Sequence, residues 1–590
     1  MLPDLPAVDR AFDYLVPDGL PPLQVGTVVR VPLHGRRVRG WVLELDVEPE
    51  TTLDRLRPLL AVVSAGPPAP MVELCAWAAW RWAGPRAPFL RSATPPNRVT
   101  ETDEPEVSVG VYPQRDAPIE LPDGARRVIR WPPATPRDAL VRALIATEGS
   151  TILVVPDLLE STRLAHELES EGRHVVPVHG GDVGAERTAS WEAARHGACV
   201  VVGGRVSVLS PVPDLRAIVV LDDADEALKE ERAPSWHALP LAAERARRVG
   251  ARLDVVSPVP TVEALSEVDA AATAEPAAER DGWARVDVVD LRDEPPGAGL
   301  LSARLADTLR AALDRRERAL CVVNRRGRAR VLACRACREV ARCAVCAAAV
   351  AEGSDRLECP RCGATSPTQC SNCGSTNLRA VRPGVVRLRE GLAGLVPRAR
   401  VLAVESGSAP LPAFDVAVGT EAVLHRAPHD AERPITVVAF LDFDQELLAP
   451  RYRAAEQALW LLVRASRQVG PRRSGGVVLV QTRTPDDPAL TAARDGAPAA
   501  VIDAEIGQRR ALAFPPFGGL AEISGEPSAV QSACDALAHD ARLHIAGPAT
   551  GRALLRAESV STLCDAIAAT DLTAARAAGR VRVDVDPLRV

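Results

Sequence analysis

Eight of the thirteen cysteines lie in one short segment and repeat a metal-binding spacing. A Cys-x-x-Cys turn directs two thiolates at one ion, and two such turns complete a tetrahedral sulfur site with no open position. The segment therefore predicts two structural zinc ions per chain. Gly363 and Gly374 directly follow second cysteines, where a positive φ suits the turn. Gaps of 5, 12 and 7 residues separate the four pairs, which are Cys334 and Cys337, Cys343 and Cys346, Cys359 and Cys362, and Cys370 and Cys373.

Three ways of joining the four pairs are open. The first two pairs are close together, whereas the 12-residue gap between the middle pairs is a common ribbon spacing. We favour an inner site and an outer site, with a crossed arrangement as the alternative. Metal-free thiols and an iron–sulfur cluster are the other interpretations. The outer set is Cys334, Cys337, Cys370 and Cys373, and the inner set is Cys343, Cys346, Cys359 and Cys362.

A run of arginines leads into the cysteine-rich segment. Ten arginines and two acidic residues lie between Arg315 and Arg342, and Arg325, Arg326 and Arg328 form the densest part. The whole chain has a net charge of -6, so affinity for nucleic acid must come from a local patch. This arginine stripe is the clearest candidate for binding phosphates. A solvated face with dispersed ion pairs is the alternative.

Composition and patterning predict a large α/β protein with several domains. The chain has 590 residues, of which 47% are hydrophobic and 25% charged. No signal-like start and no apolar run of membrane-spanning length occurs, so we expect a cytoplasmic protein in which clustered cysteines bind metal.

Two blocks alternate short apolar strands with Ala- and Leu-rich helices, which is typical of parallel sheets. The segments before and after these blocks mix strand-like runs with helical periodicity. The expected divisions are a β-rich domain at 1–95, a linker at 96–108, α/β blocks at 109–292 and 298–482, a cysteine-rich module at 334–376 inserted in the second block, and an α+β domain at 483–590.

The ordered set of motifs resembles the PriA family of primosomal replication restart proteins. The resemblance implies an N-terminal domain that binds a DNA 3′ end, two helicase-like (RecA-like) lobes with an inserted two-zinc module, and a C-terminal α+β domain. It covers nearly the whole chain. The matching segments are Asp9 to Pro17, Val25 to Pro32, Asn324-Arg325-Arg326-Gly327 with the cysteine pairs, Leu441 to Asp444, Arg451 to Glu456, Phe514 to Phe517 and Asp584 to Pro587.

The chain departs from the family at the first helicase signature. A superfamily 2 helicase has a glycine-rich loop ending in Lys-Ser/Thr at the first strand–helix turn, where the lysine neutralises phosphate charge. The matching segment here, Trp131 to Asp138, has three prolines and no glycine. The single lysine of the chain, Lys229, lies elsewhere. The sequence therefore lacks a Walker A lysine.

Two further helicase signatures are altered. Asp222-Asp223-Ala224-Asp225 stands at the position of Asp-Glu-x-His, and a degenerate strand end is the favoured interpretation, although Asp222 retains a carboxylate for magnesium. Val463 to Gly470 stands at the arginine-finger motif without its glycines or spacing. We expect no counterpart of the family's winged-helix domain, because the linker leads almost directly into the first lobe.

By resemblance, five residues fall at the pocket for the terminal nucleotide of a nascent strand: Phe12, Asp13, Tyr14, Gly26 and Arg57. An aromatic ring there stacks on a base and a carboxylate accepts from the base or the 3′-hydroxyl. The alternative is that Phe12 and Tyr14 are core residues. Arg509 and Arg510 are weaker candidates for docking the acidic tail of single-stranded DNA-binding protein.

The leading hypothesis is a fork-recognition protein in replication restart that has lost helicase and ATPase activity. Its partners would be forked and single-stranded DNA, single-stranded DNA-binding protein, and the replicative helicase with its loader, in the cytoplasm at the nucleoid. The alternatives are an active ATP-dependent 3′→5′ helicase and a zinc-binding interaction module with no DNA role.

Overall fold

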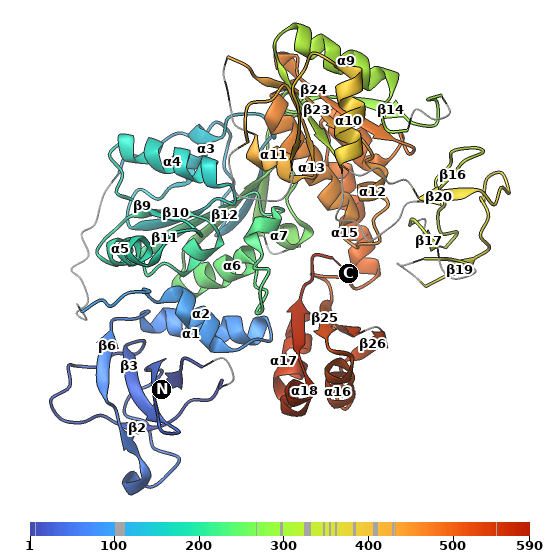
Figure 1. The fold of residues 1–590 in the computed structure, drawn as a ribbon. Helices are drawn as coiled ribbons and strands as arrows, with labels where there is room; N and C mark the ends of the chain where they lie inside the picture. Colours follow the sequence, from blue (N-terminus) through green and yellow to red (C-terminus); the bar gives the residue numbers. More distant parts are fainter. Residues whose placement is uncertain are drawn as a thin grey trace.

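The computed structural model describes residues 1–5, 8–100, 112–266, 268–295, 299–323, 332–345, 348–352, 356–359, 363–380, 385–404, 411–427, 430, 432–549 and 551–589. Two parallel α/β lobes form the body, and three smaller parts surround them (Figure 1). Within the described residues, no helix combines the length and the apolar character needed to cross a membrane.

The N-terminal domain is a four-stranded antiparallel sheet followed by two helices. Trp41, at the end of β4, is 1% exposed and donates from Nε1 to Thr94 Oγ1 at 2.8 Å, which ties the sheet to the second helix. The strands, in sheet order, are β1 (Leu2–Pro3), β4 (Arg36–Trp41), β3 (Val28–Leu33) and β6 (Ala61–Ser64); the helices are α1 (Ala69–Arg81) and α2 (Arg86–Ala93). A separate parallel pair joins β2 (Tyr14–Leu15) to β5 (Arg57–Pro58).

The first lobe contains seven parallel strands. Its central strands are nearly continuous apolar runs because helices cover both faces of the sheet. In sheet order the strands are β13 (Ala270–Thr273), β7 (Arg126–Arg130), β12 (Arg252–Ser257), β11 (Leu215–Leu221), β8 (Ser150–Val154), β10 (Val200–Gly203) and β9 (Val175–Val178). The helices are α3 (Asp138–Leu144), α4 (Leu158–Ser170), α5 (Gly184–Arg195), α6 (Ala238–Val249), α7 (Val262–Ser266) and α8 (Pro276–Asp281).

The second lobe has six parallel strands. Its edge strand β14 pairs with β24, so residues 285–290 belong to this sheet, whereas the sequence analysis placed them in the first block. In sheet order the strands are β14 (Arg285–Asp290), β24 (Val477–Thr482), β23 (Ile435–Phe440), β15 (Arg318–Val322), β22 (Val416–Gly419) and β21 (Val401–Val404). The helices are α9 (Ala303–Asp314), α10 (Val385–Leu395), α11 (Ala422–Arg426), α12 (Asp444–Leu447), α13 (Ala454–Val469), α14 (Pro488–Asp495) and α15 (Ala499–Ala511).

The cysteine-rich module projects from the second lobe as two small antiparallel sheets (Figure 1). One pairs β16 (Leu332–Cys334) with β20 (Leu378–Ala380), the two ends of the module. The other contains β17 (Ala351–Glu352), β18 (Leu357–Glu358) and β19 (Thr365–Ser366).

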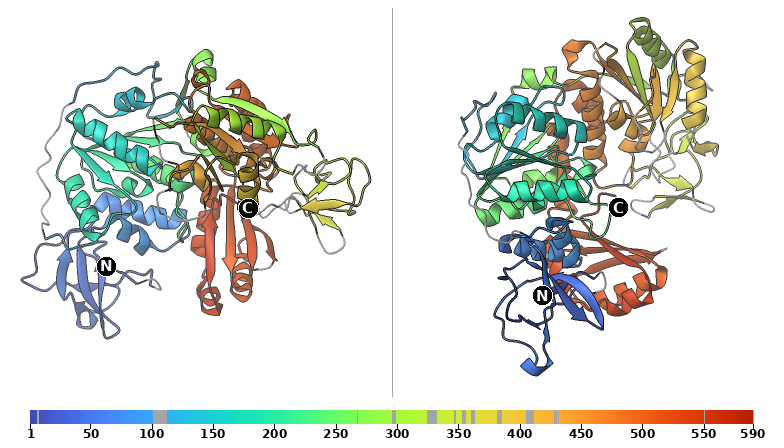
Figure 2. Two further views of the ribbon diagram at one scale, coloured as in Figure 1. Left: turned by 45° about the horizontal axis from the view of Figure 1, so that its top comes forward. Right: turned by 60° about the vertical axis from the view of Figure 1, so that its left-hand side comes forward.

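The C-terminal domain is a β-α-β-β-α-β sandwich with an extra helix before its last strand. In sheet order its strands are β26 (His544–Ala549), β27 (Arg552–Ala557), β25 (Gly519–Gly525) and β28 (Val581–Val585); its helices are α16 (Pro527–Leu537), α17 (Val560–Ala569) and α18 (Thr573–Ala578). Figure 2 shows this domain beside the N-terminal one. Trp80 Nε1 of α1 donates to Asp565 of α17 at 2.9 Å.

Candidate functional site

The structure brings together the sulfurs of the outer four cysteines, the set that we favoured for one ion. The sulfurs of Cys334, Cys337, Cys370 and Cys373 all lie within 4.8 Å of one another. Cys334 and Cys373 are separated by 3.6 Å, and Cys337 and Cys370 by 3.5 Å. Four sulfurs around a tetrahedral zinc at ~2.3 Å would lie about 3.8 Å apart. The donor set and its spacing therefore fit a metal ion.

Both turns of this cluster have the same backbone geometry. The amides of Arg338 and Gly374 each donate at 2.9 Å to the carbonyl of the first cysteine of their pair. Both residues adopt a positive φ, 65° for Arg338 and 73° for Gly374. Glycine adopts this conformation without steric cost, so Gly374 meets the expectation from the sequence. Arg338 adopts it with a full side chain.

The inner cysteines are described only in part, because Cys346 and Cys362 lie outside the described residues. Cys343 and Cys359 are buried in one apolar cluster. Gly363 has a φ of 71° and its amide donates to the carbonyl of Cys359 at 2.9 Å, as in the outer site. The inner ligand set stays a prediction.

Arg338 also docks the module onto the second lobe. Its guanidinium donates to the carbonyl of Arg292 at 2.7 Å and to that of Glu294. Arg292 of the lobe is in turn paired with Glu339 of the module at 3.5 Å, so each part contributes an arginine to the contact. Val340 and Ala349 add an apolar contact with Leu448.

The densest part of the arginine stripe, Arg325, Arg326 and Arg328, lies outside the described residues. Arg315 and Arg318 flank it. Arg315 is paired with Glu317 at 2.8 Å, and Arg318 donates to the carbonyl of Arg433 at 2.6 Å. The phosphate-binding role of the stripe stays a prediction.

Four of the five predicted 3′-end residues lie on or next to the small β2–β5 ribbon in the chain. Tyr14 is paired with Arg57 in register, and Arg57 is exposed. The Asp13 carboxylate accepts from the amide of Glu50 at 3.0 Å. The Phe12 ring is half-buried, with the Arg10 guanidinium 5.9 Å from its centroid. Phe12, Asp13 and Arg57 therefore remain available to a ligand.

Tyr14 and Gly26 contribute to the packing of the domain. The Tyr14 hydroxyl donates to the carbonyl of Pro32 at 3.0 Å, and its ring packs against the cluster around Val29. Gly26 has a φ of 93°, and a Cβ there would lie 1.7 Å from the carbonyl oxygen of Pro67. A side chain at position 26 would force β3 away from the segment that leads into α1.

The segment that replaces the glycine-rich loop uses its amides internally. Strand β7 ends at Arg130 and α3 begins at Asp138, so this is the first strand–helix turn of the lobe. The amide of Ala134 donates to Gly282 and that of Thr135 to Pro132, at 2.9 and 3.3 Å. The segment lines a cavity of about 500 Å³ between the lobes, together with Trp460.

Asp222 at the end of β11 is fully engaged by two arginines. Its Oδ1 accepts from Arg137 at 3.0 Å and from Arg467 at 2.7 Å, and its Oδ2 accepts from the same two groups at 2.8 and 2.7 Å. A carboxylate oxygen has about two acceptor sites. Both are occupied on each oxygen, which leaves none for magnesium. The two guanidinium groups hold the pKa of Asp222 well below its usual range, although burial opposes them.

Asp223 and Asp225 have separate structural roles. Asp223 Oδ2 accepts from the amide and hydroxyl of Thr261 at 2.8 and 2.6 Å. Burial raises the pKa of Asp223 to about 6. Asp225 caps a short 3-10 helix through the amide of Ala227 and accepts from Arg464 at 2.7 Å.

Arg464 and Arg467 are the residues that sequence reasoning missed. They lie one turn apart on α13 and both reach the first lobe. Each guanidinium lies over the Trp460 ring, at 5.5 and 5.4 Å from the centroid. The sequence carried little signal for them, because α13 also contains Glu456, Gln457 and Gln468, so the two arginines look like part of a polar face.

Lys229 is a structural residue. Its ammonium group donates to Asp584 Oδ1 at 2.9 Å and to the carbonyls of Val585 and Asp586 at 3.1 and 2.5 Å. It therefore fastens the first lobe to β28. Burial lowers the pKa of this ammonium group, and the carboxylate of Asp584 opposes that effect.

Comparison with known proteins agrees with this architecture. Residues 2–95 match the family model described as the 3′ DNA-binding domain of PriA. The "Probable replication restart protein PriA" of Mycobacterium tuberculosis (strain H37Rv) is 31% identical over 592 residues, which cover 90% of this chain and 87% of that protein. The chain belongs to the PriA family.

Other PriA proteins match over a shorter stretch. The replication restart protein of Treponema pallidum is 27% identical over 64% of this chain and 60% of its own length. That of Bacillus subtilis is 24% identical over 65% of this chain and 50% of its own length. Among solved structures, RecG bound to a three-way DNA junction has a TM-score of 0.35 at 12% identity, covering 66% of this chain and 46% of that one.

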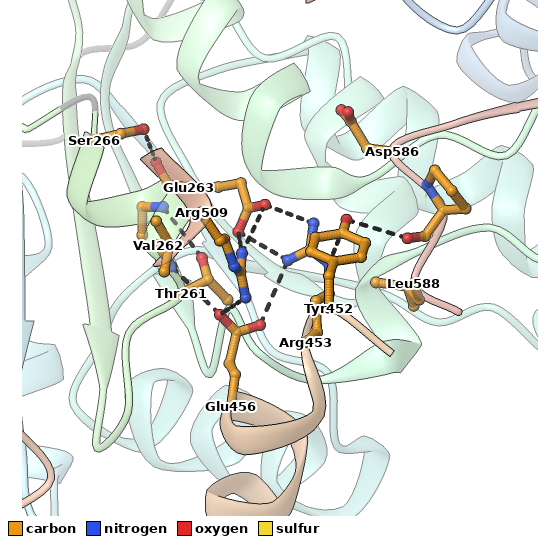
Figure 3. Close-up of polar contacts among 12 residues, drawn as sticks. Thr261, Val262, Glu263, Ser266, Tyr452, Arg453, Glu456, Arg509, Asp586 and Leu588 are labelled. Carbon is orange, nitrogen blue, oxygen red and sulfur yellow. Dashed lines mark hydrogen bonds and ion pairs between the residues drawn. The ribbon is translucent and has the colours of Figure 1, made fainter. Parts of the chain in front are cut away.

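Three of the PriA-family motifs, Arg451 to Glu456, Phe514 to Phe517 and Asp584 to Pro587, meet at one buried junction. Figure 3 shows the contacts of Tyr452 and Arg453 there. Tyr452 donates from its hydroxyl to the carbonyl of Pro587 at 3.2 Å and stacks on Phe514 at 5.1 Å. Arg453 binds Glu263 of α7 through two contacts of 2.8 and 2.5 Å. These motifs therefore join the lobes to the C-terminal domain.

The docking role that the sequence suggested for Arg509 is wrong, because this residue is buried. Arg509 is 1% exposed and is paired with Glu505 at 2.8 Å, Glu456 at 3.1 Å and Glu263 at 3.3 Å. It is therefore unavailable to the acidic tail of a partner. The sequence did not reveal this buried network, because the three acidic partners lie on three different helices. Its neighbour Arg510 is exposed, over the Phe517 ring.

Proposed function

We propose that this PriA-family chain recognises replication forks with a DNA 3′ end and serves as a platform for reloading the replicative helicase, without hydrolysing ATP. Family membership gives the role in replication restart. The main support for the lack of ATP hydrolysis is the Asp222 carboxylate. Its acceptor sites are all occupied by arginines, so it offers no free oxygen to magnesium.

The surroundings of Asp222 support the same conclusion. Helicases neutralise the phosphates of ATP with a lysine and with backbone amides of a glycine-rich loop. This turn has three prolines, and the amides of Ala134 and Thr135 are already engaged. The guanidinium of Arg137 is paired with Asp222 and also with Glu160, at 2.8 and 2.5 Å. The other arginines that line the cavity between the lobes, Arg163, Arg464 and Arg467, are also paired with acidic side chains.

The N-terminal domain supplies the DNA-binding part of the proposal. Phe12 offers a ring for stacking on the terminal base, Asp13 an acceptor for the 3′-hydroxyl, and Arg57 a cation for a phosphate. Tyr14 and Gly26 shape this pocket from within. Arg325, Arg326 and Arg328 are proposed to bind the fork arms beside two structural zinc ions, one in each cysteine set.

The remaining partners follow from this role. We include single-stranded DNA, single-stranded DNA-binding protein, and the replicative helicase with its loader, in the cytoplasm at the nucleoid. Arg509 is buried, so of the two arginines that the sequence suggested for docking the acidic tail only the exposed Arg510 is retained.

The deciding experiment measures fork binding and ATP turnover on one purified sample. We expect nanomolar to micromolar binding of a fork with a free 3′ end and no ATP hydrolysis above background. Turnover above roughly 1 s⁻¹, the low end for enzymes, would instead show an active helicase. Failure to bind any forked DNA would leave the zinc-module alternative.

Phe12→Ala tests the end pocket separately. It should weaken binding to forks with a free 3′ end and leave blunt duplex binding unchanged. Phe517→Ala, a similar truncation in the C-terminal domain, is the control. An equal loss on both DNAs would contradict an end-specific pocket.

A double change, Arg325→Ala with Arg326→Ala, tests the arginine stripe. Each phosphate contact adds about 0.9 to the slope of log K against log salt on duplex DNA. We expect the slope to fall by about 1–2, and an unaltered slope would remove the stripe from the interface.

A further inference from the structure

The two lobes are joined across the former nucleotide site by a carboxylate held between arginines from both sides. Asp222 and Arg137 belong to the first lobe, and Arg467 belongs to α13 of the second. Each arginine makes two parallel contacts with the Asp222 carboxylate, all between 2.7 and 3.0 Å. The Asp222 residue is 1% exposed. Paired contacts of this kind fix orientation as well as distance.

Neighbouring contacts hold Arg467 in this position. Its Nε donates to the carbonyl of Pro133 in the first lobe at 3.2 Å. One turn earlier on α13, Arg464 binds Asp225 of the first lobe at 2.7 Å and Glu421 of the second. Trp460 lies against both guanidinium groups.

A second buried cluster fixes the other end of α13 (Figure 3). Arg453, just before the helix, binds Glu263 of the first lobe, and Glu456 accepts from the amide of Val262 at 3.4 Å. Arg509 of α15 bridges Glu263 and Glu456. Arg453 and Arg467 are 14 residues apart, about 21 Å along a helix at 1.5 Å per residue. Rotation of the lobes about either cluster would break the other.

We propose that the Asp222 carboxylate takes the place of a nucleotide's phosphate and keeps the two lobes permanently closed. Motor lobes of the helicase type close when groups of one lobe reach a phosphate bound on the other. Here the anion is part of the chain, so closure requires no ligand. The inference rests on the proposed loss of ATP hydrolysis and adds to it a fixed geometry of the lobes.

Removal of the Asp222 carboxylate should create an anion-binding site between the lobes. Asp222→Ala leaves two guanidinium groups facing the space that the carboxylate group occupied, which opens into the cavity between the lobes. Inorganic phosphate should occupy it, because paired arginines bind phosphate through the same two-point contacts. Phosphate should then close the variant again, whereas it should have no effect on the lobes of the unaltered chain.

The test measures the distance between the lobes by energy transfer between dyes on non-natural residues at positions 169 and 310, which are exposed on α4 and α9. The unaltered chain should give one distance, unchanged by ATP analogues with magnesium. Arg467→Ala should lengthen and broaden the distribution. This change leaves Asp222 paired with Arg137 inside the first lobe, so that lobe keeps its fold.

Inorganic phosphate should shorten the distance in Asp222→Ala at constant ionic strength, but not in Asp222→Ala combined with Arg467→Ala. The matched control is Asp254→Asn. Asp254 is fully buried and held by Arg127 at 2.5 Å and Arg252 at 2.7 Å, all within the first lobe. The Asp254→Asn change should lower thermal stability without changing the distance between the lobes.

Two results would overturn the proposal. One is an interlobe distance in the unaltered chain that changes when nucleotide is added. The other is a distance distribution in Arg467→Ala and in Asp222→Ala that is identical to that of the unaltered chain. The proposed function fails differently. ATP turnover or absent fork binding in the unaltered chain would refute that function while the interlobe distance is still read independently.

Discussion

At the scale of single residues, neighbouring carboxylates at one strand end have opposite properties. Asp222 and Asp223 are adjacent and equally buried. Two guanidinium groups lower the pKa of Asp222. Burial raises the pKa of Asp223 to about 6, and its hydrogen bonds from the neutral donors of Thr261 oppose this only in part. The carboxylate whose pKa is lowered is the one that joins the lobes.

Asp223→Asn should stabilise the protein at neutral pH. The folded chain holds the Asp223 proton up to about pH 6, while an unperturbed group releases it near 3.8, so the free energy of unfolding falls as pH rises between these values. A shift of about two units corresponds to ~3 kcal/mol. Chemical denaturation should show the variant equal to the unaltered chain near pH 4 and more stable by about 2–3 kcal/mol at pH 7.

Asp222→Asn supplies the contrast in the same assay. Its depressed pKa gives stability that is present above the unperturbed value and is lost as pH falls. The asparagine variant should therefore be less stable at pH 7. The same sign for both substitutions would show that the two environments are wrongly assigned.

Cysteine substitutions test the metal centres residue by residue. Cys370→Ser or Cys343→Ser should each lower bound zinc from two ions to about one, because each removes a ligand from a different site. Elemental analysis of the purified protein measures this directly. Cys534→Ser changes a buried cysteine of the C-terminal domain and should leave two ions. Unchanged zinc in Cys370→Ser would refute the outer ligand set.

At the scale of elements, short turns and a single helix determine how the parts are placed. Helix α13 contacts the first lobe near both of its ends, through Arg453 and through Arg467. The cysteine turn that contains Arg338 both encloses the metal site and docks the module.

Arg338→Gly should separate these two tasks of the turn. Glycine suits the φ of 65°, so zinc content should stay the same, while loss of the contacts with Arg292 and Glu294 should loosen the module. Hydrogen exchange should become faster at the β16–β20 pair. Gly374→Ala should have the opposite effect. The contacts of Arg338 with the lobe remain, while a side chain at a φ of 73° adds strain of about 1 kcal/mol to the metal-site turn. Equal exchange in Arg338→Gly and the unaltered chain would show that this contact does not hold the module.

At the scale of the whole molecule, buried ion pairs connect parts that are distant in the sequence. Lys229 of the first lobe binds the last strand, and Arg81 of the N-terminal domain is paired with Asp586. Tyr452 of the second lobe also binds this C-terminal segment, which therefore contacts the N-terminal domain and both lobes. The chain is organised as one connected scaffold.

Lys229→Met should release the C-terminal domain. The change leaves Asp584 and two carbonyls without their cation in a buried site, at a cost of about 3–5 kcal/mol. Limited proteolysis should cut faster near residues 512–518, ahead of β25, and thermal stability should fall. Lys229→Arg keeps the positive charge and should lose less thermal stability than Lys229→Met. Equal stability of Lys229→Met and the unaltered chain would contradict this role.

The sequence alone determined what depends on local pattern. The Cys-x-x-Cys spacing indicated metal sites, and the apolar runs indicated parallel sheets. The segment from Trp131 to Asp138 showed prolines in place of the glycine-rich motif. These properties are set within a few residues. The family resemblance, carried by ordered motifs, is confirmed by the match to PriA proteins.

Only the tertiary structure decided which charges meet. Asp222 is 85 residues from Arg137 and 245 from Arg467, and Arg509 is 246 from Glu263. No local pattern encodes such pairs, since a surface arginine and a buried one look alike in sequence. Burial requires each charge to find a partner, and the packing of the two lobes selected which one.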